Sequence, residues 1–193
     1  AYFDERRIGG FMRLSNDQYE DIKETIASLF VEYDIRCIPI NAFEIAIKMG
    51  LKIIPYSALS EEKENVALNI SQDGFSIEKI GGEWIIFYND HCNSYGRINQ
   101  TIMHEIGHYW LGHIKDGSQE ELEANFFAKY ALAPPPLIHN MPGEISTWNI
   151  MKYFDLSFEA AQNAYSYYCK WLRYGGKQYR EYEVEMIDLF EVA

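Results

Sequence analysis

The motif His104-Glu105-Ile-Gly-His108 lies in a segment whose apolar residues recur at helical intervals. On an α-helix, residues four positions apart share a face, so both histidines can direct a ring nitrogen at one metal ion, with Glu105 beside it. Zinc lowers the pKa of a bound water to about 7, and a neighbouring carboxylate can move that proton to a leaving amine. The motif therefore requires a helix here and predicts a zinc site that hydrolyses peptide bonds, with His104 and His108 as ligands and Glu105 as the general base.

A third ligand is expected further along the chain, because catalytic zinc usually has three protein ligands and one open position. After a polar turn, residues 120–132 are acidic at their start and then apolar at helical intervals, which predicts a second helix. Glu121 and Asn125 are four positions apart on this helix and share a face. We therefore predict that Glu121 binds the metal and that Asn125 hydrogen-bonds a ligand histidine.

Two neighbouring glutamates compete with Glu121 for the metal, and helical geometry separates them. Glu123 lies roughly 200° around the helix from Glu121 and is expected to point elsewhere. Glu120 is the closer rival, but the residue one turn after it is Ala124, which cannot orient a ligand. The geometry thus favours Glu121.

A third histidine is the other alternative for the third ligand. The metzincin pattern H-E-x-x-H-x-x-G-x-x-H would need glycine at position 111 and histidine at position 114, where this chain has Leu111 and Ile114. His113 is interpreted as a structural residue, or as a cap on the end of its helix.

Both predicted helices resemble those of the ImmA/IrrE family of zinc metallopeptidases. Four features occur in the same order over residues 97–134: the zinc motif, a Leu-Gly-His ending, the sequence E-x-E-A-N-x-F-A that begins at Glu121, and a later proline. The resemblance implies a gluzincin-like site in which His104, His108 and Glu121 bind one zinc ion per chain and Glu105 is the general base. Family members usually have Leu-Met-Pro where this chain has Leu-Ala-Pro-Pro-Pro, so a differently shaped loop is expected after the second helix, which bears on substrate preference and not on metal binding.

With 193 residues and 48% hydrophobic content, the chain can bury a full core and is expected to form one domain. The resemblance implies an α+β, zincin-like metallopeptidase domain over residues 12–176. In this fold a small twisted sheet, antiparallel or mixed, packs on the zinc-binding helix pair at about 97–133, with extra helices at both ends. Residues 177–193 are predicted to be an acidic docking helix or a loose tail. Residues 1–11 are interpreted as a leader or a cloning remnant.

Capping and turn signals define further elements on both sides of the zinc helices. The sheet that they predict has three or four strands, and its edge either holds an extended substrate as an added strand or serves only to build the core. The predicted elements are, in chain order, a helix from the Ser15-x-x-Gln18 capping box to about Tyr33, a helix from Asn41 to Gly50, a strand at 51–55, a weaker strand at 66–70, a hairpin of 74–80 and 83–88 around Gly81-Gly82, and helices at 144–154 and from Ser157 to Gly175.

The formal net charge of −12 repels phosphate backbones, so direct binding of nucleic acid is not expected. No segment approaches the roughly 18 apolar residues of a membrane span, and no signal sequence is recognisable. Cys37, Cys92 and Cys169 are odd in number and widely spaced, which argues against a disulfide framework. A soluble, cytoplasmic protein is therefore expected.

The leading functional hypothesis is a zinc endopeptidase that acts on a protein substrate, which the resemblance implies to be a helix-turn-helix repressor of a mobile element or stress circuit. The main alternative is a regulatory, antitoxin-like binding module that keeps the fold without proteolysis, and the intact Glu105 favours the enzyme over it. In a third hypothesis the two motif histidines are core residues of a structural domain. Substrate-binding residues are not assigned, and Tyr109, Arg97 and His139 are among the groups that could stabilise the oxyanion.

Overall fold

The computed structural model describes residues 13–92, 94–114, 117–175 and 178–191. The expected leader or cloning remnant at residues 1–11 lies outside these ranges. The elements are α1 (Asn16–Glu32), α2 (Ala42–Lys48), β1 (Lys52–Pro55), the 3-10 helix η1 (Tyr56–Ala58), α3 (Glu61–Ile70), β2 (Gly74–Glu78), β3 (Trp84–Tyr88), α4 (Tyr95–Trp110), α5 (Ser118–Leu132), α6 (Pro135–Asn140), α7 (Thr147–Tyr153), α8 (Phe158–Tyr174) and α9 (Glu181–Glu191).

The strands form a mixed sheet in the order β1-β3-β2, which leaves β2 at an edge. β1 runs parallel to β3, whereas β2 runs antiparallel to it, with Gly74 opposite Tyr88. The predicted hairpin between β2 and β3 is confirmed. Its turn glycines, Gly81 and Gly82, have φ angles of 108° and 86°, which residues with a side chain rarely adopt. The predicted α+β class is confirmed, and the sheet is the mixed one of the two alternatives.

The prediction of a weak strand at 66–70 is wrong, because these residues end helix α3. A short apolar run does not by itself distinguish a strand from a helix. Three glutamates occupy the first turn of α3, where negative charge stabilises the positive end of the helix dipole. Ala67 is buried, while Val66 and Ile70 stay exposed, so the helix needs only one narrow face for packing.

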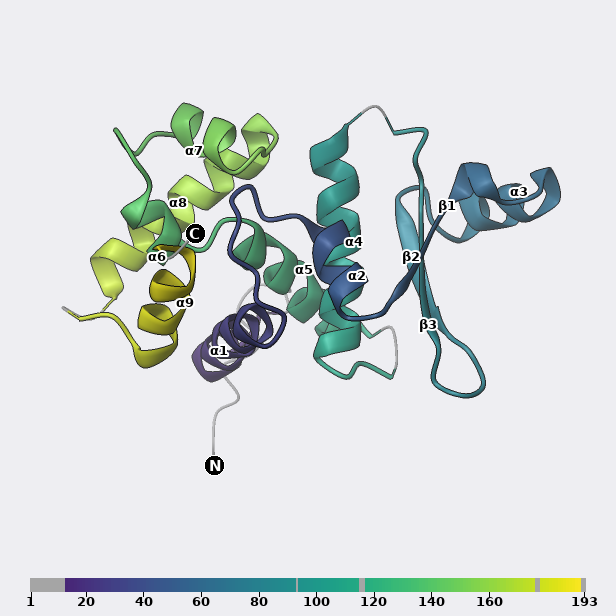
Figure 1. Ribbon diagram of the computed structural model, residues 1–193, viewed down its shortest axis with the longest axis horizontal. Helices are drawn as coiled ribbons and strands as arrows, with labels where there is room; N and C mark the ends of the chain where they lie inside the picture. Colours follow the sequence, from purple (N-terminus) through teal and green to yellow (C-terminus); the bar gives the residue numbers. More distant parts are fainter. Residues whose placement is uncertain (1–12, 93, 115–116, 176–177, 192–193) are drawn as a thin grey trace.

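Helix α4 lies between the sheet and the helical half of the molecule (Figure 1). It contacts β2 and β3 of the sheet, and also the helices α2 and α5. Its side chains Ile102, Met103 and Ile106 are fully buried. Gly107 lies so close to α5 that an added Cβ would meet the ring of Phe127 at 3.0 Å. This close approach packs the C-terminal part of α4 against α5.

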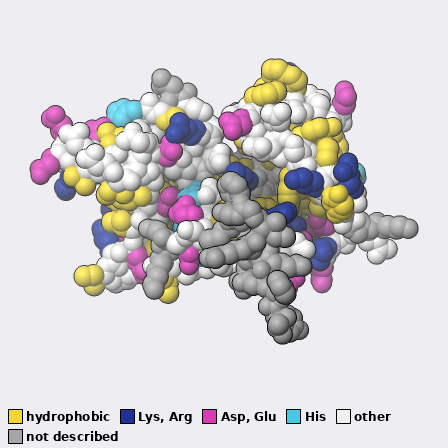
Figure 2. Space-filling model, turned by 180° about the vertical axis from the view of Figure 1, so that it is seen from behind, with side chains coloured by type: hydrophobic (Ala, Val, Ile, Leu, Met, Phe, Trp, Pro, Cys, Tyr) yellow, Lys and Arg dark blue, Asp and Glu magenta, His cyan; other side chains and the backbone are white. Residues whose placement is uncertain are grey.

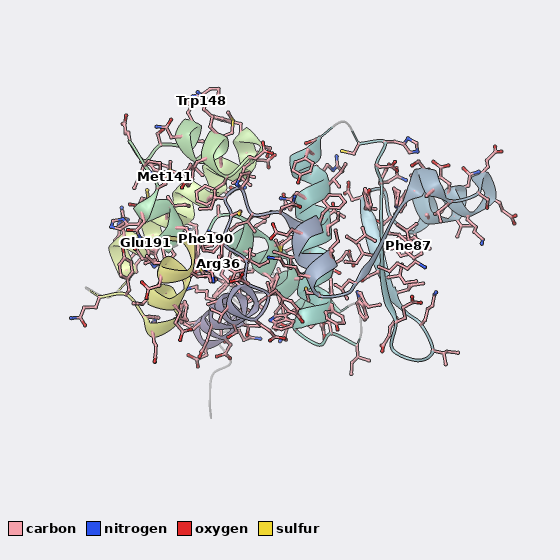
Figure 3. All side chains as sticks on the ribbon, in the orientation of Figure 1. Arg36, Phe87, Met141, Trp148, Phe190 and Glu191 are labelled. Carbon is pink, nitrogen blue, oxygen red and sulfur yellow. The ribbon has the colours of Figure 1, made fainter. Side chains whose placement is uncertain are left out.

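The last helix, α9, packs against α1 and α6, so the two ends of the described chain meet. Phe190 of α9 lies near α1 (Figure 3), with its ring centroid 5.7 Å from that of Phe30. The hydroxyl of Tyr182 donates a hydrogen bond to Glu20 at 2.9 Å. Residues 181–191 therefore form a docking helix, and the alternative of a loose tail does not apply to them.

No helix in the described parts of the chain is long and apolar enough to cross a lipid bilayer. Cys37, Cys92 and Cys169 are all free thiols, as their number and spacing predict. Cys37 is exposed, and the other two are partly buried.

Candidate metal and active site

Helix α4 carries both motif histidines on one face, in the turns before it ends at Trp110. Their Nε2 atoms converge and lie 3.0 Å apart. Glu121 comes from the first turn of α5, with Oε1 3.2 Å from Nε2 of His108 and Oε2 3.5 Å from Nε2 of His104. The side chains predicted as ligands therefore meet at one point, with their ligand atoms within 4.8 Å of one another.

A zinc ion fits this group of side chains. Two imidazole nitrogens and one carboxylate oxygen form a common ligand set of catalytic zinc, which leaves the fourth position open for water or substrate. Ligand atoms about 2.0–2.1 Å from a tetrahedral zinc lie roughly 3.3 Å from each other. The nitrogen and oxygen atoms here lie 3.0 to 3.5 Å apart. Both the donor types and their spacing therefore suit zinc.

The carboxylate of Glu105 lies next to this site and is held by the sheet. Glu105 is 7% exposed, and Ser76 of β2 donates its hydroxyl hydrogen to Oε2 of Glu105 at 2.6 Å. Burial, and then the nearby carboxylates of Glu105 and Asp73, raise the pKa of Tyr56 to about 12, so its hydroxyl stays protonated at neutral pH. No local pattern in the sequence points to Ser76, because its contact with Glu105 joins two elements that are far apart in the chain.

Comparison with known families agrees with this geometry. The IrrE N-terminal-like domain of the M78 peptidases matches residues 63–166, more than half of the 193 residues. The chain belongs to this family. The matched region contains the His104, His108 and Glu121 group, and the protein is a zinc metalloendopeptidase of the ImmA/IrrE type, as the resemblance implies. No curated protein matches the chain.

The two rival glutamates of this M78 peptidase point away from the converging ligand atoms. The carboxylate of Glu120 folds back over Gly117 at the start of α5. Glu123 points toward His113, with its Oε2 3.0 Å from the Nε2 of that ring. Among the three glutamates, helical geometry therefore predicts the one that faces the histidines.

Asn125 and His113 both lie close to the candidate ligands. Asn125 lines the cleft one turn after Glu121, where its amide donates to the backbone oxygen of Glu121 at 2.7 Å. The imidazole of His113 lies against His108, with the two Nδ1 atoms 3.0 Å apart. The sequence signal for this contact is a histidine directly after the glycine that ends the zinc helix, but the sequence pattern alone does not predict that the two rings meet.

An open cleft with a volume of about 1210 Å³ runs past the site of this M78 peptidase. One wall is the edge strand β2 with residues 74–76, and another is α8, which contributes Ala160, Ala164 and Tyr167. The sheet and α8 lie on opposite sides of α4 (Figure 1). On the face turned away from that view, histidine and acidic side chains are visible together near the middle of the molecule (Figure 2). The cleft is therefore long enough for more than the reacting bond alone.

Of the three groups considered for the oxyanion, the structure places Arg97 in the lining of the cleft. Its guanidinium pairs with Asp73 at 2.6 Å, and this hydrogen bond raises the pKa of Arg97. Tyr109 packs against β3. His139 lies beside α8, with Nδ1 2.9 Å from the hydroxyl of Tyr168. Arg97 is thus the one of the three that lines the cleft.

Proposed function

We propose that this M78 peptidase hydrolyses peptide bonds of a protein substrate, with His104, His108 and Glu121 binding one zinc ion and Glu105 acting as general base. The observation that carries the proposal is the convergence of three zinc-type ligand atoms beside a buried carboxylate in an open cleft. Asn125, one turn after Glu121, is proposed as a supporting group.

The roles of the protein groups follow from their positions. When bound, zinc supplies Lewis acidity that lowers the pKa of a water molecule beside it. Glu105 accepts a proton from the attacking water and later delivers it to the nitrogen of the leaving amine. Ser76 holds the carboxylate of Glu105 in place for both transfers. Burial of Glu105 keeps bulk water away from it, which strengthens these interactions.

We propose that the substrate lies along β2 as an added strand. β2 is an edge strand, and its residues 74–76 line the cleft beside the candidate zinc ligands. A peptide in extended form can pair with such an edge through its backbone, while its side chains reach the surrounding walls. Because only an extended chain can pair in this way, cleavage is expected in an exposed, flexible segment of the substrate.

The proposed substrate is a helix-turn-helix repressor encoded near this peptidase and met in the cytoplasm. Two features support this proposal: the resemblance to ImmA/IrrE proteins, and a net charge of −12, which favours a basic protein partner. Binding should weaken as salt rises, because acidic and basic faces attract each other less when screened.

The test is to mix the purified repressor with zinc-loaded wild-type protein and with zinc-loaded Glu105→Gln, and to search for fragments by mass spectrometry. Glu105→Gln keeps the size of the side chain but cannot act as a base, so its cleavage rate should fall by about 10²–10⁴-fold. Glu24→Gln, which changes an exposed carboxylate of α1 outside the cleft, is the control and should cleave normally.

An unchanged rate in Glu105→Gln would rule out the proposed base. Loss of the repressor's DNA binding with both forms, without fragments, would favour the binding module instead.

A further inference from the structure

A series of hydrogen-bonded side chains, His108, His113 and Glu123, leads from the candidate metal site into the protein. Nε2 of His108 faces the other two ligands, and its Nδ1 lies 3.0 Å from Nδ1 of His113. Nε2 of His113 in turn lies 3.0 Å from Oε2 of Glu123. The side chains of His113 and Glu123 are 7% and 18% exposed, so water competes poorly for these contacts.

One arrangement of protons satisfies both contacts with neutral rings. A ring nitrogen that binds a metal carries no proton, so Nδ1 of His108 must carry one and donate it. Nδ1 of His113 is then the acceptor. The proton of His113 is on Nε2, where it is donated to the carboxylate of Glu123. Each ring nitrogen in these two contacts therefore acts either as a donor or as an acceptor.

The backbone at the end of α4 holds His113 against His108. Gly112, with a φ of 70°, turns the chain, and its N–H donates to the oxygen of Tyr109 at 3.1 Å. The N–H of His113 donates to the backbone oxygen of His108 at 3.0 Å. These two bonds are those of a Schellman motif. His113 is thus tied by its backbone to the same residue that its ring contacts.

Glu123, the last residue in this series of hydrogen bonds, is held by side chains of α5 and α1. Oε1 of Glu123 accepts hydrogen bonds from Nε2 of Gln119 at 3.0 Å and from Nε2 of Gln18 at 3.1 Å. Gln18 belongs to the capping box of α1, where its own Oε1 accepts from the N–H of Ser15 at 2.9 Å. Glu123 therefore has little freedom to leave His113.

We propose that His113 is a positioning residue for the zinc site: it accepts the Nδ1 proton of His108 and so fixes the tautomer and orientation of that ring, while Glu123 fixes His113. The inference rests on the proposed function, because it takes His108 as a zinc ligand. Metal-binding histidines usually donate their second N–H to a fixed acceptor, and loss of that acceptor weakens metal binding by about 10–100-fold. In this protein the acceptor is the imidazole of His113. The carboxylate of Glu123 contacts that imidazole and not the ligand histidine.

The test compares zinc dissociation constants, measured by competition with a chromophoric chelator, for wild type and three variants. His113→Leu should bind zinc about 10–100-fold more weakly. His113→Asn should recover most of this loss, because its Oδ1 can take the place of Nδ1 as acceptor. Glu123→Ala should lose less than His113→Leu. Visible absorption of the cobalt-loaded proteins should change in His113→Leu and return toward wild type in His113→Asn.

The control is His91→Leu, because His91 forms a similar pair with Glu64 at 2.7 Å on the surface. Its zinc affinity should equal that of wild type. Wild-type affinity in His113→Leu, or an affinity of His113→Asn no better than that of His113→Leu, would overturn the inference. Should His113→Leu not fold, an unchanged zinc affinity in Glu123→Ala would overturn it. A wild-type protein that binds no zinc would contradict the proposed function itself.

Discussion

At the scale of single residues, two carboxylates near the same two histidines differ in their surroundings. The side chain of Glu121 is 48% exposed and points at the imidazoles. Glu105 is buried and receives a hydrogen bond from Ser76. A carboxylate that can approach the histidines from solvent suits a metal ligand, whereas one held beside them suits proton transfer. Position in the fold, and not residue type, therefore separates their proposed roles.

Removing any one ligand should remove the metal. His104→Ala, His108→Ala and Glu121→Ala are each expected to reduce zinc from one ion per chain to almost none, because a two-ligand remnant binds zinc poorly. Metal analysis of the purified variants measures this directly. Glu120→Ala, whose carboxylate lies over Gly117, is the control and should keep its zinc. If Glu120→Ala loses zinc while Glu121→Ala keeps it, the assignment of the third ligand is wrong.

Ser76→Ala tests whether the sheet positions the base. A hydrogen bond to a charged group contributes about 1.5–3 kcal/mol, so losing it in the transition state should lower kcat by at least about tenfold. Zinc content should not change. Ser57→Ala is a matched control, because Ser57 donates a similar hydrogen bond to Asp90 outside the cleft. Equal kcat values for Ser76→Ala and wild type would show that the hydrogen bond from Ser76 does not contribute to the action of Glu105 as a base.

At the scale of elements, the site depends on how closely α4 and α5 approach each other. One helix carries two candidate ligands and the other carries the third, so the distance between the helices sets the distances between ligand atoms. Gly107 permits this distance, because even one added carbon would press on the Phe127 ring.

Gly107→Ala should lower the melting temperature and weaken zinc binding. Replacing glycine by alanine inside a helix stabilises the folded state by about 1 kcal/mol, but overpacking against the Phe127 ring destabilises it by about 1–3 kcal/mol. Gly96→Ala is the matched control on the same helix, since its added Cβ would stay 3.6 Å from the nearest atom. That variant should be as stable as wild type or more so, with unchanged zinc affinity. Thermal unfolding and chelator competition measure both effects, and a Gly107→Ala protein as stable as Gly96→Ala would contradict this account.

At the scale of the whole molecule, α1 joins the zinc helices to the C-terminal helix. Through Gln18 it reaches Glu123 on α5, and through Glu20 it reaches Tyr182 on α9. Glu20 also accepts a hydrogen bond from Lys23, which is 8% exposed. Burial alone would raise the pKa of Glu20, but the hydrogen bonds from Lys23 and Tyr182, with the nearby charges, lower it below its usual value.

A carboxylate with a lowered pKa in the folded state stabilises the protein at higher pH, and this contribution is lost as the pH falls through that pKa. Glu20→Gln should therefore be less stable than wild type at pH 7, and the difference should shrink as the pH falls below 4.5, the ordinary pKa of the group. Urea unfolding over this pH range measures the difference. Glu24→Gln, which changes an exposed glutamate on the same helix, is the matched control. A constant difference between Glu20→Gln and wild type would contradict the expectation.

The sequence alone determined those parts of the protein that depend on neighbours within one helix or turn. The spacing of four residues places His104 and His108 on one face, and the same periodicity selects Glu121 over its rivals. The Ser15-x-x-Gln18 capping box and the Gly81-Gly82 turn also act over a few residues, and both appear where the sequence predicts them. The family resemblance rests on these local patterns as well.

The tertiary structure decided whatever depends on residues far apart in the chain. Residues 66–70 form a short apolar run that predicts a weak strand, but in the fold they end helix α3, which contacts η1. Ser76 meets Glu105 because β2 packs on α4, a contact that no periodicity encodes. The path from His108 through His113 and Glu123 to α1 likewise exists because three helices end beside one another. Such contacts depend on the free energy of the whole packed arrangement, which no short stretch of sequence contains.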